Sequence, residues 1–320
     1  MAETAPISIE PRAFVSLVAG VGRTPLIELE SLAGLPAGTR LFAKLEARNP
    51  GGSLKDRPVA RMLRRAFHEG RFADGRRLLD SSSGNAGIAY AMFGAALGVP
   101  VTLVVPGNAS RERLERIRAH GAELILTDPI EGYDFALREA QRLAAEHPDL
   151  YWHADQYAND ENWRAHFEGT GPEILEGLKQ QTGAGPDVFV AGIGTGGSLT
   201  GIGRCLRAAH ADIRIVAVIP ELFPGIEGLK PLGHPGDIVP AILEESLIDQ
   251  RVEVTLEQAA AVCHELAAQG LFVGPSSGAN VHVARLVAQE RGPLVIATLL
   301  CDTGERYGTT GLWSSASDGR

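Results

Sequence analysis

Residues 187–198 read DVFVAGIGTGGS, an apolar run that leads directly into four closely spaced glycines and a serine. A short apolar run that ends at a glycine is typical of a buried parallel strand. Glycines at a strand-to-helix junction let the backbone approach an anion, and the N-terminus of the following helix favours negative charge. The stretch therefore predicts a strand, a loop suited to a phosphate and a helix, with a plain tight turn as the alternative.

Similar apolar runs recur along the chain and alternate with helical patterns. The expected strands are Leu41–Leu45, Val101–Val105, Leu124–Leu126, Val188–Ala191, Ile213–Val218 and Leu294–Leu300. The expected helices are Ser110–His120, Tyr133–Glu146, Asn162–Lys179 and Leu256–Ala268. Such alternation predicts an α/β fold whose parallel sheets are covered by helices on both faces. A length of 320 residues suits roughly two domains, and without a low-complexity linker between them we expect the two to interleave.

One segment, Ile88–Val105, is apolar and long enough to suggest a membrane span. Gly94, Gly98 and Pro100 interrupt it, and a compact VTLVV run follows the proline. A buried helix followed by a buried strand explains these residues better. We therefore expect no membrane partner.

Charge and cysteine content exclude several other classes of protein. Lys and Arg total 30 against 39 Asp and Glu, a net charge of −9. Without a basic cluster, a nucleic acid or an anionic membrane is not an expected partner. Cys205, Cys263 and Cys301 form no CxxC pair and no zinc spacing, which argues against disulfides and a metal site. The N-terminus lacks a signal-peptide pattern, so we expect a cytoplasmic protein.

Three further loops gather small and polar residues at the start of an expected helix. The first, residues 49–57, reads NPGGSLKDR and places Lys55 at a helix N-terminus, where the helix dipole should lower the pKa of its amine. An ordinary surface lysine is the alternative. Residues 81–87, SSSGNAG, offer backbone N–H groups and hydroxyls to an anion, although a helix cap would also use one serine. Residues 274–278, GPSSG, taken alone predict a cap.

The glycine loop also matches a nicotinamide-binding pattern. Gly192, Gly194 and Gly197 fit G-x-G-x-x-G, and Glu221 follows the next strand at about the spacing of a ribose-binding acid. That pattern normally opens its domain, whereas here several βα units precede it. A nicotinamide-dependent oxidoreductase is therefore a remote alternative, and it leaves the lysine and serine loops unexplained.

In this order and spacing, NPGGSLKDR, SSSGNAG, GTGGS and PSSGA resemble the cysteine synthase family of fold-type II pyridoxal-phosphate enzymes. The stretch KLEARNPGGSLKDRP at 44–58 is most similar to the B-type or phosphoserine-using branch. Supporting motifs are TPL at 24–26, QY at 156–157, GTGPEI at 169–174 and DTGERY at 302–307, so the resemblance runs from Arg23 to Tyr307. It implies two interleaved three-layer α/β/α domains with mainly parallel sheets, and a homodimer. Residues 46–155 would form a smaller, mobile substrate-loop domain, and residues 1–45 and 156–320 a larger cofactor-binding domain.

The resemblance also implies roles for single residues, with pyridoxal 5′-phosphate as the cofactor. Lys55 matches the catalytic lysine that holds the cofactor aldehyde as a Schiff base and moves the substrate Cα proton. Asn85 matches the partner of the ring hydroxyl, and Ser276 the residue that faces the pyridine nitrogen. The phosphate loop corresponds to Gly194, Thr195, Gly196, Gly197 and Ser198. The residues that match the substrate-binding positions are Ser82, Ser83, Gly84, Asn85, Ala86 and Gln156.

The implied reaction is β-replacement on O-acetylserine or O-phosphoserine with sulfide or another sulfur donor, giving L-cysteine through an enzyme-bound aminoacrylate. A neutral Ser276 would not keep the pyridine nitrogen protonated, so transamination is not favoured. Related alternatives use an amine nucleophile, as in a diaminopropionate-type synthase, or homocysteine, or run as a cysteine desulfhydrase. A cofactor-binding but inactive partner protein is a further alternative, and the retained Lys55 and Asn85 argue against it.

Two departures from the family pattern leave the donor open. Ala86 stands where many members carry a threonine, which removes a hydroxyl from the carboxylate-binding loop. The phosphate-reading arginine of the phosphoserine branch is absent from Glu221-Leu222-Phe223, where it should lie. Lys230 is the cation that could take its place as a point charge.

Overall fold

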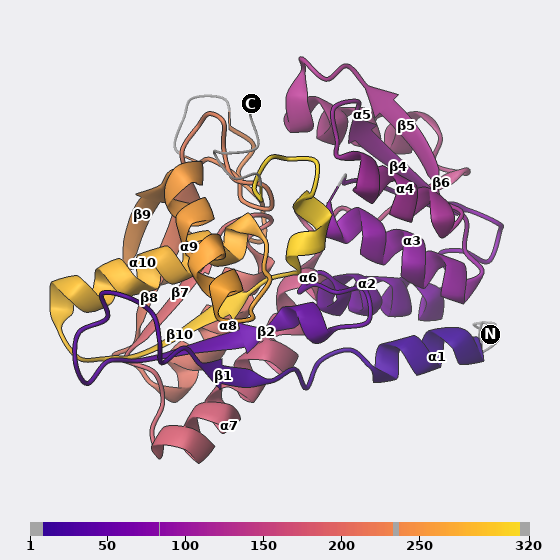
Figure 1. Cartoon of the computed structure of the whole chain (residues 1–320). Helices are drawn as coiled ribbons and strands as arrows, with labels where there is room; N and C mark the ends of the chain where they lie inside the picture. The colour runs from indigo at the N-terminus through magenta and orange to yellow at the C-terminus, as the bar shows by residue number, and fades with distance from the viewer. Residues whose placement is uncertain (1–8, 83, 233–236, 314–320) are drawn as a thin grey trace.

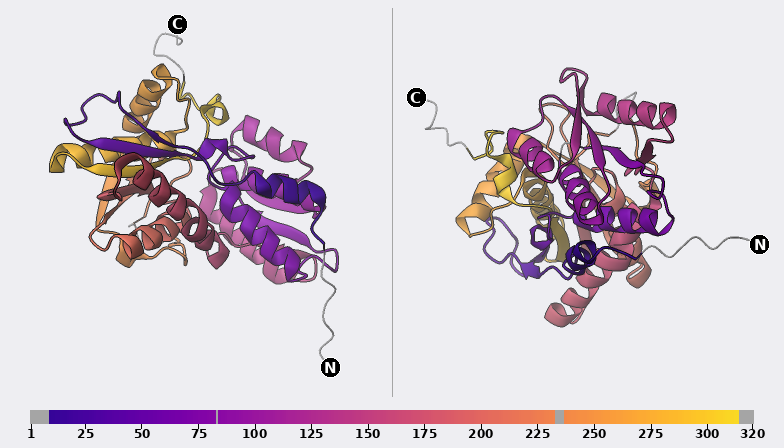
Figure 2. Two further views of the ribbon diagram at one scale, coloured as in Figure 1. Left: turned by 90° about the horizontal axis from the view of Figure 1, so that it is seen from below. Right: turned by 90° about the vertical axis from the view of Figure 1, so that its right-hand side faces the viewer.

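The structure is a computed structural model that describes residues 9–82, 84–232 and 237–313. Two lobes lie side by side, one built on a six-stranded sheet and the other on a four-stranded sheet (Figures 1 and 2). All paired strands are parallel except β1 with β2. The predicted α/β class with mainly parallel sheets is therefore confirmed.

The larger sheet runs in the order β1-β2-β10-β7-β8-β9. Its strands are β1 Leu26–Glu28, β2 Arg40–Leu45, β10 Val295–Leu300, β7 Val188–Gly192, β8 Arg214–Pro220 and β9 Gln250–Val254. Strand β2 pairs with β10, so segments from opposite ends of the chain are neighbours. Between β2 and β7 the chain builds the other sheet and returns, and the two lobes thus interleave in sequence.

Helices cover both faces of the larger sheet because each has one apolar side. Helices α9 (Leu256–Ala268) and α10 (Pro275–Arg291) pack on one face through a core that includes Val262 and Val283. Helices α7 (Gly171–Thr182) and α8 (Gly197–Ala209) pack on the other face around residues such as Ile202. This lobe therefore has three layers.

The smaller sheet runs in the order β5-β4-β3-β6 and is wholly parallel. Its strands are β3 Arg77–Ser81, β4 Val101–Pro106, β5 Glu123–Thr127 and β6 Tyr151–His153. The helices of this lobe are α1 Arg12–Ala19, α2 Asp56–His68, α3 Asn85–Leu97, α4 Arg111–Ala119 and α5 Gly132–Glu146. Residues of α1 to α4 share one apolar core with this sheet, whereas α5 packs on β3 and β4 through a separate cluster.

The N-terminal segment 1–45, which we assign to the larger domain, is divided between the lobes. Phe14 of α1 is fully buried and packs edge-on against Phe93 of α3, with ring centroids 6.0 Å apart. Strands β1 and β2 belong to the larger sheet. The division at residues 46 and 155 remains a prediction.

The shorter helices complete the structure. They are α6 Asp160–Ala165, the π-helix His166–Thr170, and the 3₁₀ turns Glu46–Arg48, Glu245–Leu247 and Gly304–Tyr307. The expected helix over 162–179 is therefore split into α6, a π-helical turn and α7. Pro172 lies in the first turn of α7, and because proline has no N–H to donate, the regular hydrogen-bond ladder is interrupted there.

The segment expected to be a buried helix and strand is α3 followed by β4, with Gly98 in a left-handed conformation at φ 72° between them. Most of its residues are buried in the smaller lobe's core, whereas Ala95, Gly98 and Pro100 are exposed. Among the described residues, no helix combines the length and apolarity that a membrane crossing requires.

Candidate active site

A pocket lies where the carboxyl ends of β2, β10 and β7 meet, at the junction with the smaller lobe. In open α/β sheets ligands bind at this edge. The loop after β2 supplies Lys55, the loop after β7 supplies Gly194, and the loop after β3 supplies Asn85. The residues that line the pocket are Leu54, Lys55, Asn85, Asn162, His166, Gly192, Gly194, Thr195, Ser198, Gly228, Leu229, Ser276, Asn280, Leu299 and Cys301. Residues from all four sequence motifs are thus brought together.

Lys55 immediately precedes helix α2, as the sequence predicts. Burial lowers the pKa of its amine, and the nearby Cys301 and Asp302 partly oppose this shift. The direction agrees with the expectation from the helix dipole, but the largest cause is the removal of the ammonium group from water. A lysine in this environment can lose its proton and act as a base or nucleophile.

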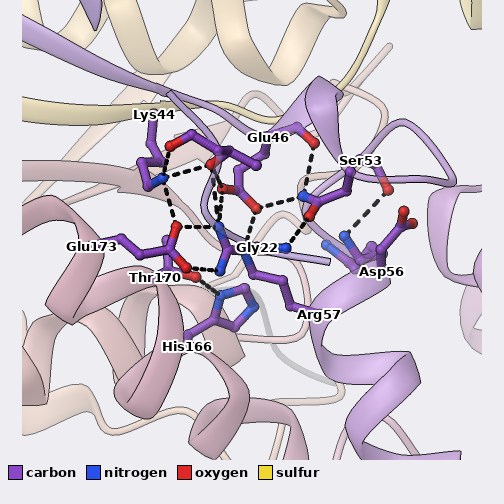
Figure 3. A network of polar contacts seen from close by, with 12 residues as sticks. Gly22, Lys44, Glu46, Ser53, Asp56, Arg57, His166, Thr170 and Glu173 are labelled. Carbon is purple, nitrogen blue, oxygen red and sulfur yellow. Dashed lines mark hydrogen bonds and ion pairs between the residues drawn. The ribbon is translucent and has the colours of Figure 1, made fainter. Parts of the chain in front are cut away.

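A buried network of charged side chains lies next to the lysine loop (Figure 3). Arg57 Nε donates to Glu46 Oε2 at 2.6 Å, and Arg57 Nη1 donates to Glu173 Oε1 at 2.7 Å. Lys44 Nζ lies 2.7 Å from Glu173 Oε2. The two cations lower the pKa of Glu173 to about 2, despite its burial. The charges therefore compensate one another inside the protein.

The network fixes where the lysine loop begins. Asn49 Nδ2 donates to Glu46 Oε2 at 2.9 Å, and its Oδ1 accepts from the Gly22 backbone N–H at 2.8 Å. Thr24 Oγ1 donates to the other Glu46 oxygen at 2.7 Å. The TPL and GTGPEI motifs supply Thr24 and Glu173 to this network. Their part is structural: they hold the segment that carries Lys55.

The glycines of the phosphate loop leave no room for a side chain at their positions. Gly196 has φ 83° and caps helix α8. A Cβ on Gly197 would lie 2.1 Å from Asn162 Oδ1, and one on Gly194 would lie 2.7 Å from the Gly228 carbonyl oxygen. Asn162 Nδ2 also donates to Thr195 Oγ1 at 3.1 Å. Backbone N–H groups at the start of a helix, without Cβ atoms in the way, form a cradle that fits a phosphate group.

Four helices begin at this pocket: Lys55 immediately precedes α2, and Asn85, Gly197 and Pro275 are the first residues of α3, α8 and α10. Their positive ends converge on one volume. Among the described lining residues there is no Asp, Glu or Arg. Recognition of an anion in this pocket therefore relies on backbone N–H groups, helix N-termini and the side chain of Lys55.

Ser276 and Asn280 form another wall of the pocket, in the first turns of α10. Ser276 is almost fully buried. Asn280 is fully buried and donates from Nδ2 to the Leu299 carbonyl oxygen at 3.1 Å, whereas its Oδ1 has no hydrogen-bond partner among the described residues. A buried, unpaired acceptor facing a polar pocket suits a site that a ligand completes.

The predicted substrate-binding residues lie at the start of α3 and beside it. Ser82 Oγ accepts from the backbone N–H groups of Gly84 and Gly87, at 3.3 and 3.0 Å, and so acts as a cap. Gln156 Nε2 donates to the Ser81 carbonyl oxygen at 3.0 Å. Ala86 is buried within α3. Ser83 lies outside the described residues.

Several pocket residues escaped the sequence prediction, notably Asn162 and His166. Asn162 Nδ2 donates to the Gln156 carbonyl oxygen at 2.7 Å, and His166 Nδ1 lies 2.9 Å from Thr170 Oγ1. Burial lowers the pKa of His166 well below its usual range. Asn162, His166 and Thr170 are spaced four residues apart, which would place them on one helix face. This four-residue spacing is the feature of the sequence from which Asn162 and His166 could have been predicted as neighbours.

The nicotinamide alternative is not supported by the position of Glu221. Its Oε1 accepts the Leu256 backbone N–H at 2.7 Å, at the start of α9. The carboxylate thus satisfies a free helix N–H group rather than serving a ribose. Among the described residues, no group of three or more His, Cys, Asp or Glu side chains could hold a metal ion.

Comparisons with known proteins agree with this geometry. The family model for "Pyridoxal-phosphate dependent enzyme" matches residues 17–302. A cysteine synthase from Aquifex aeolicus is 44% identical over 302 residues, covering 92% of this chain and 90% of its own length. Cysteine synthase B from Pseudomonas aeruginosa is 37% identical, covering 92% and 95%. The crystal structure of an O-ureido-L-serine synthase has a TM-score of 0.85 and 35% identity, covering 95% of this chain and 96% of that one. The chain therefore belongs to the cysteine synthase family of pyridoxal-phosphate dependent enzymes.

Proposed function

We propose that this enzyme replaces the β-substituent of an O-activated L-serine, O-acetylserine or O-phosphoserine, with sulfide or another sulfur donor to give L-cysteine. The observation that carries the proposal is the pocket in which Lys55, Asn85, Gly194 and Ser276 meet. The relatives described above support this reaction type.

The residues present fit pyridoxal 5′-phosphate. The glycine loop would hold the phosphate group of the cofactor. Because Gly194, Gly196 and Gly197 have no Cβ atom, their backbone N–H groups can approach the phosphate closely. Lys55 would bind its aldehyde, Asn85 would meet its ring hydroxyl, and Ser276 would face its pyridine nitrogen. When bound, the cofactor makes the Cα proton of an attached amino acid acidic.

Lys55 would carry the proton in both halves of the reaction. Because burial lowers the pKa of its amine, Lys55 can be neutral when it must accept the substrate Cα proton. The resulting ammonium group, held in the same pocket, can return that proton to Cα at the end. The ion network around Arg57 and Glu46 would keep this lysine loop in place during the exchange.

Ser276 would set the type of reaction. A serine hydroxyl is neutral, and the described lining residues include no carboxylate that could hold a proton on the pyridine nitrogen. The site would therefore stabilise negative charge at Cα only modestly. Loss of a leaving group from Cβ relieves this charge more readily than transamination does.

The loop at 82–86 and Gln156 would bind the substrate carboxylate. The amide nitrogen of Gln156 has two hydrogens, of which one donates to the Ser81 carbonyl oxygen. Residues 46–155 would move as a unit and close over the substrate, excluding water from the reacting carbon. The carboxylate would then be held by backbone N–H groups and the remaining side-chain donors.

The nucleophile needs a direct test, because a similar structure is an O-ureido-L-serine synthase. A second candidate function is accordingly β-replacement with a nucleophile other than sulfide. Spectral titration with O-acetylserine, O-phosphoserine and cysteine would identify the donor by the concentration at which the visible band changes. Competition among sulfide, amines and thiols would then identify the acceptor.

Lys55→Ala provides the main test. We expect the wild-type protein to be yellow, borohydride to fix the cofactor on Lys55, and the variant to lose both properties and turnover. Lys179→Ala is the control, because Lys179 is an exposed lysine on α7. A colourless protein that binds a nicotinamide cofactor, or normal turnover by Lys55→Ala, would contradict the proposal.

A cytoplasmic homodimer is the setting we propose. The three cysteines are free in the structure, which suits a reducing compartment. Light scattering of the purified protein would test the dimer, and a monomer mass would contradict it.

A further inference from the structure

The side-chain amide of Asn85 is held at both of its ends. Asn85 Nδ2 donates to Asp302 Oδ2 at 2.7 Å, and its Oδ1 accepts a hydrogen bond from Arg306 Nη1. Asn85 begins α3 in the smaller lobe, whereas Asp302 and Arg306 follow β10 of the larger sheet. We call Asp302 and Arg306 together the amide clamp.

The chemistry of the clamp allows the amide only one orientation. A carboxylate can only accept hydrogen bonds and a guanidinium can only donate them. Rotating the amide of Asn85 by 180° would place its oxygen against Asp302 and its NH₂ group against Arg306. Both contacts would then be repulsive. An asparagine among water molecules has no such constraint.

The clamp residues are themselves fixed. Asp302 is fully buried and accepts from Tyr307 Oη at 2.6 Å. Arg306 is 5% exposed and donates from Nη2 to the Gly51 carbonyl oxygen, in the lysine loop. The clamp therefore joins three segments: the lysine loop, the start of α3 and the DTGERY motif.

Asn85 keeps one hydrogen for a ligand. Its NH₂ group has two hydrogens, and Asp302 accepts one of them. Because Arg306 draws electron density from the amide oxygen, the remaining N–H becomes a stronger donor. Asn85 also lines the pocket with Lys55. The group that Asn85 presents to the pocket is thus an oriented donor.

The geometry points to Asp302 and Arg306 as positioning residues for the cofactor: they hold Asn85 so that it can only donate to the ring hydroxyl, and they couple this contact to the lysine loop. This inference rests on the proposed function, which supplies the cofactor as the ligand of Asn85. Neither residue needs to touch substrate or cofactor for this role.

The test uses Asp302→Asn and Arg306→Lys. Asp302→Asn keeps the shape but can accept or donate, so one of the two contacts that fix the orientation of the Asn85 amide is lost, and only Arg306 still constrains it. Arg306→Lys keeps the charge but lacks the fork that reaches Asn85 and Gly51 together. Asp249→Asn is the matched control, because Asp249 accepts hydrogen bonds from Arg207 and from the Ile215 N–H, and none of these residues lines the pocket.

In the loaded enzyme we expect both clamp variants to shift the visible absorption of the bound cofactor and to weaken its binding by about tenfold or more. In the cofactor-free protein we expect faster hydrogen exchange at the amides of residues 86–90. The control should change neither the spectrum nor the affinity. A purely structural clamp would lower the melting temperature without moving the spectrum.

Wild-type spectra and cofactor affinity in both clamp variants would overturn the inference. If Asp302→Asn fails to fold, the affinity of Asn85→Ala is compared with that of the double variant Asn85→Ala/Arg306→Lys. Because Arg306 acts through Asn85, the two substitutions should not have additive effects on cofactor affinity, and additive effects would contradict the clamp. Failure of the proposed function is distinguishable, because the wild-type protein would then carry no cofactor on Lys55. The exchange arm needs no cofactor, and unchanged exchange at 86–90 would count against the clamp.

Discussion

Lys230 Nζ lies 2.5 Å from Asp134 Oδ1, an ion pair that joins the loop after β8 to helix α5 of the smaller lobe. Lys230 follows the pocket residues Gly228 and Leu229, and its amine lies 5.9 Å from the centre of the Tyr157 ring. Lys230, the cation that the sequence offers for a phosphate group, is therefore already paired with a carboxylate. A donor whose β-substituent is uncharged before it leaves, as the acetyl ester of O-acetylserine is, fits this arrangement better.

This pairing predicts the donor preference. We expect wild-type enzyme to favour O-acetylserine, and Asp134→Asn to raise the ratio of kcat/KM for O-phosphoserine over O-acetylserine by roughly tenfold, as the freed ammonium attracts the phosphate. Glu139→Gln is the control on the same helix, where Glu139 pairs with Arg142 at the surface. An unchanged ratio in Asp134→Asn would show that Lys230 does not face the leaving group.

The network around Arg57 predicts a large loss of stability when one partner is neutralised. Glu46 is fully buried, so Glu46→Gln leaves two cations, Arg57 and Lys44, to share the single carboxylate of Glu173, with one positive charge uncompensated. We expect the free energy of unfolding to fall by about 3 kcal/mol or more. Glu115→Gln on α4 breaks the exposed pair with Arg111 and should cost less than about 1 kcal/mol. Urea unfolding measures both, and equal losses would refute the structural role of the network.

The sequence predicted best the features that depend on local pattern. Apolar runs such as Val188–Ala191 located central buried strands to within a residue or two of their ends. Strand β9 was missed because Gln250–Val254 is largely polar and lies at the edge of its sheet. Strand β1 has three residues, too few to show an alternation. Edge strands bury little and do not require an apolar run, although the edge strand β5 has one at Leu124–Leu126 and was predicted from it.

The contacts that shape the pocket depend on residues far apart in the chain. Asn85 and Asp302 are 217 positions apart, and Arg57 and Glu173 are 116 apart. The motifs around these residues can be recognised in the sequence, but no local pattern predicts which motifs contact one another in the fold. The sequence placed Lys55 and the glycine loop at the pocket, and only the fold showed which side chains hold them.

The buried carboxyl of Asp56 should make the stability of the protein depend on pH. Burial raises the pKa of its carboxyl from 3.8 to about 7. The folded state therefore holds this proton more tightly than the unfolded state does. The stability that the protonated carboxyl contributes is fully present below about pH 3.8 and is lost as the pH rises through about 7. Asp56→Asn cannot ionise and can still accept the Gly51 N–H. We expect the variant to gain in melting temperature relative to wild type from pH 5 to pH 8, and a constant difference would be inconsistent with this shift.

Two glycines of helix α8 offer a matched pair for testing the cradle. A Cβ on Gly197 would lie 2.1 Å from Asn162 Oδ1, whereas one on Gly203 would meet nothing nearer than 3.5 Å. Gly197→Ala must displace Asn162, and with it the hydrogen bonds to Thr195 and Gln156. Gly203→Ala fits and should stabilise the helix by up to about 1 kcal/mol.

We therefore expect Gly197→Ala to lose cofactor affinity by at least about tenfold, and Gly203→Ala to bind as the wild type does and to melt at the same or a higher temperature. Equilibrium dialysis and thermal unfolding measure the two effects separately. Adding Asn162→Ala to Gly197→Ala removes the clash but also the bond to Thr195, so affinity should recover only in part. Full affinity in Gly197→Ala alone would mean that the loop can shift without consequence, and the cradle would then not be the phosphate site.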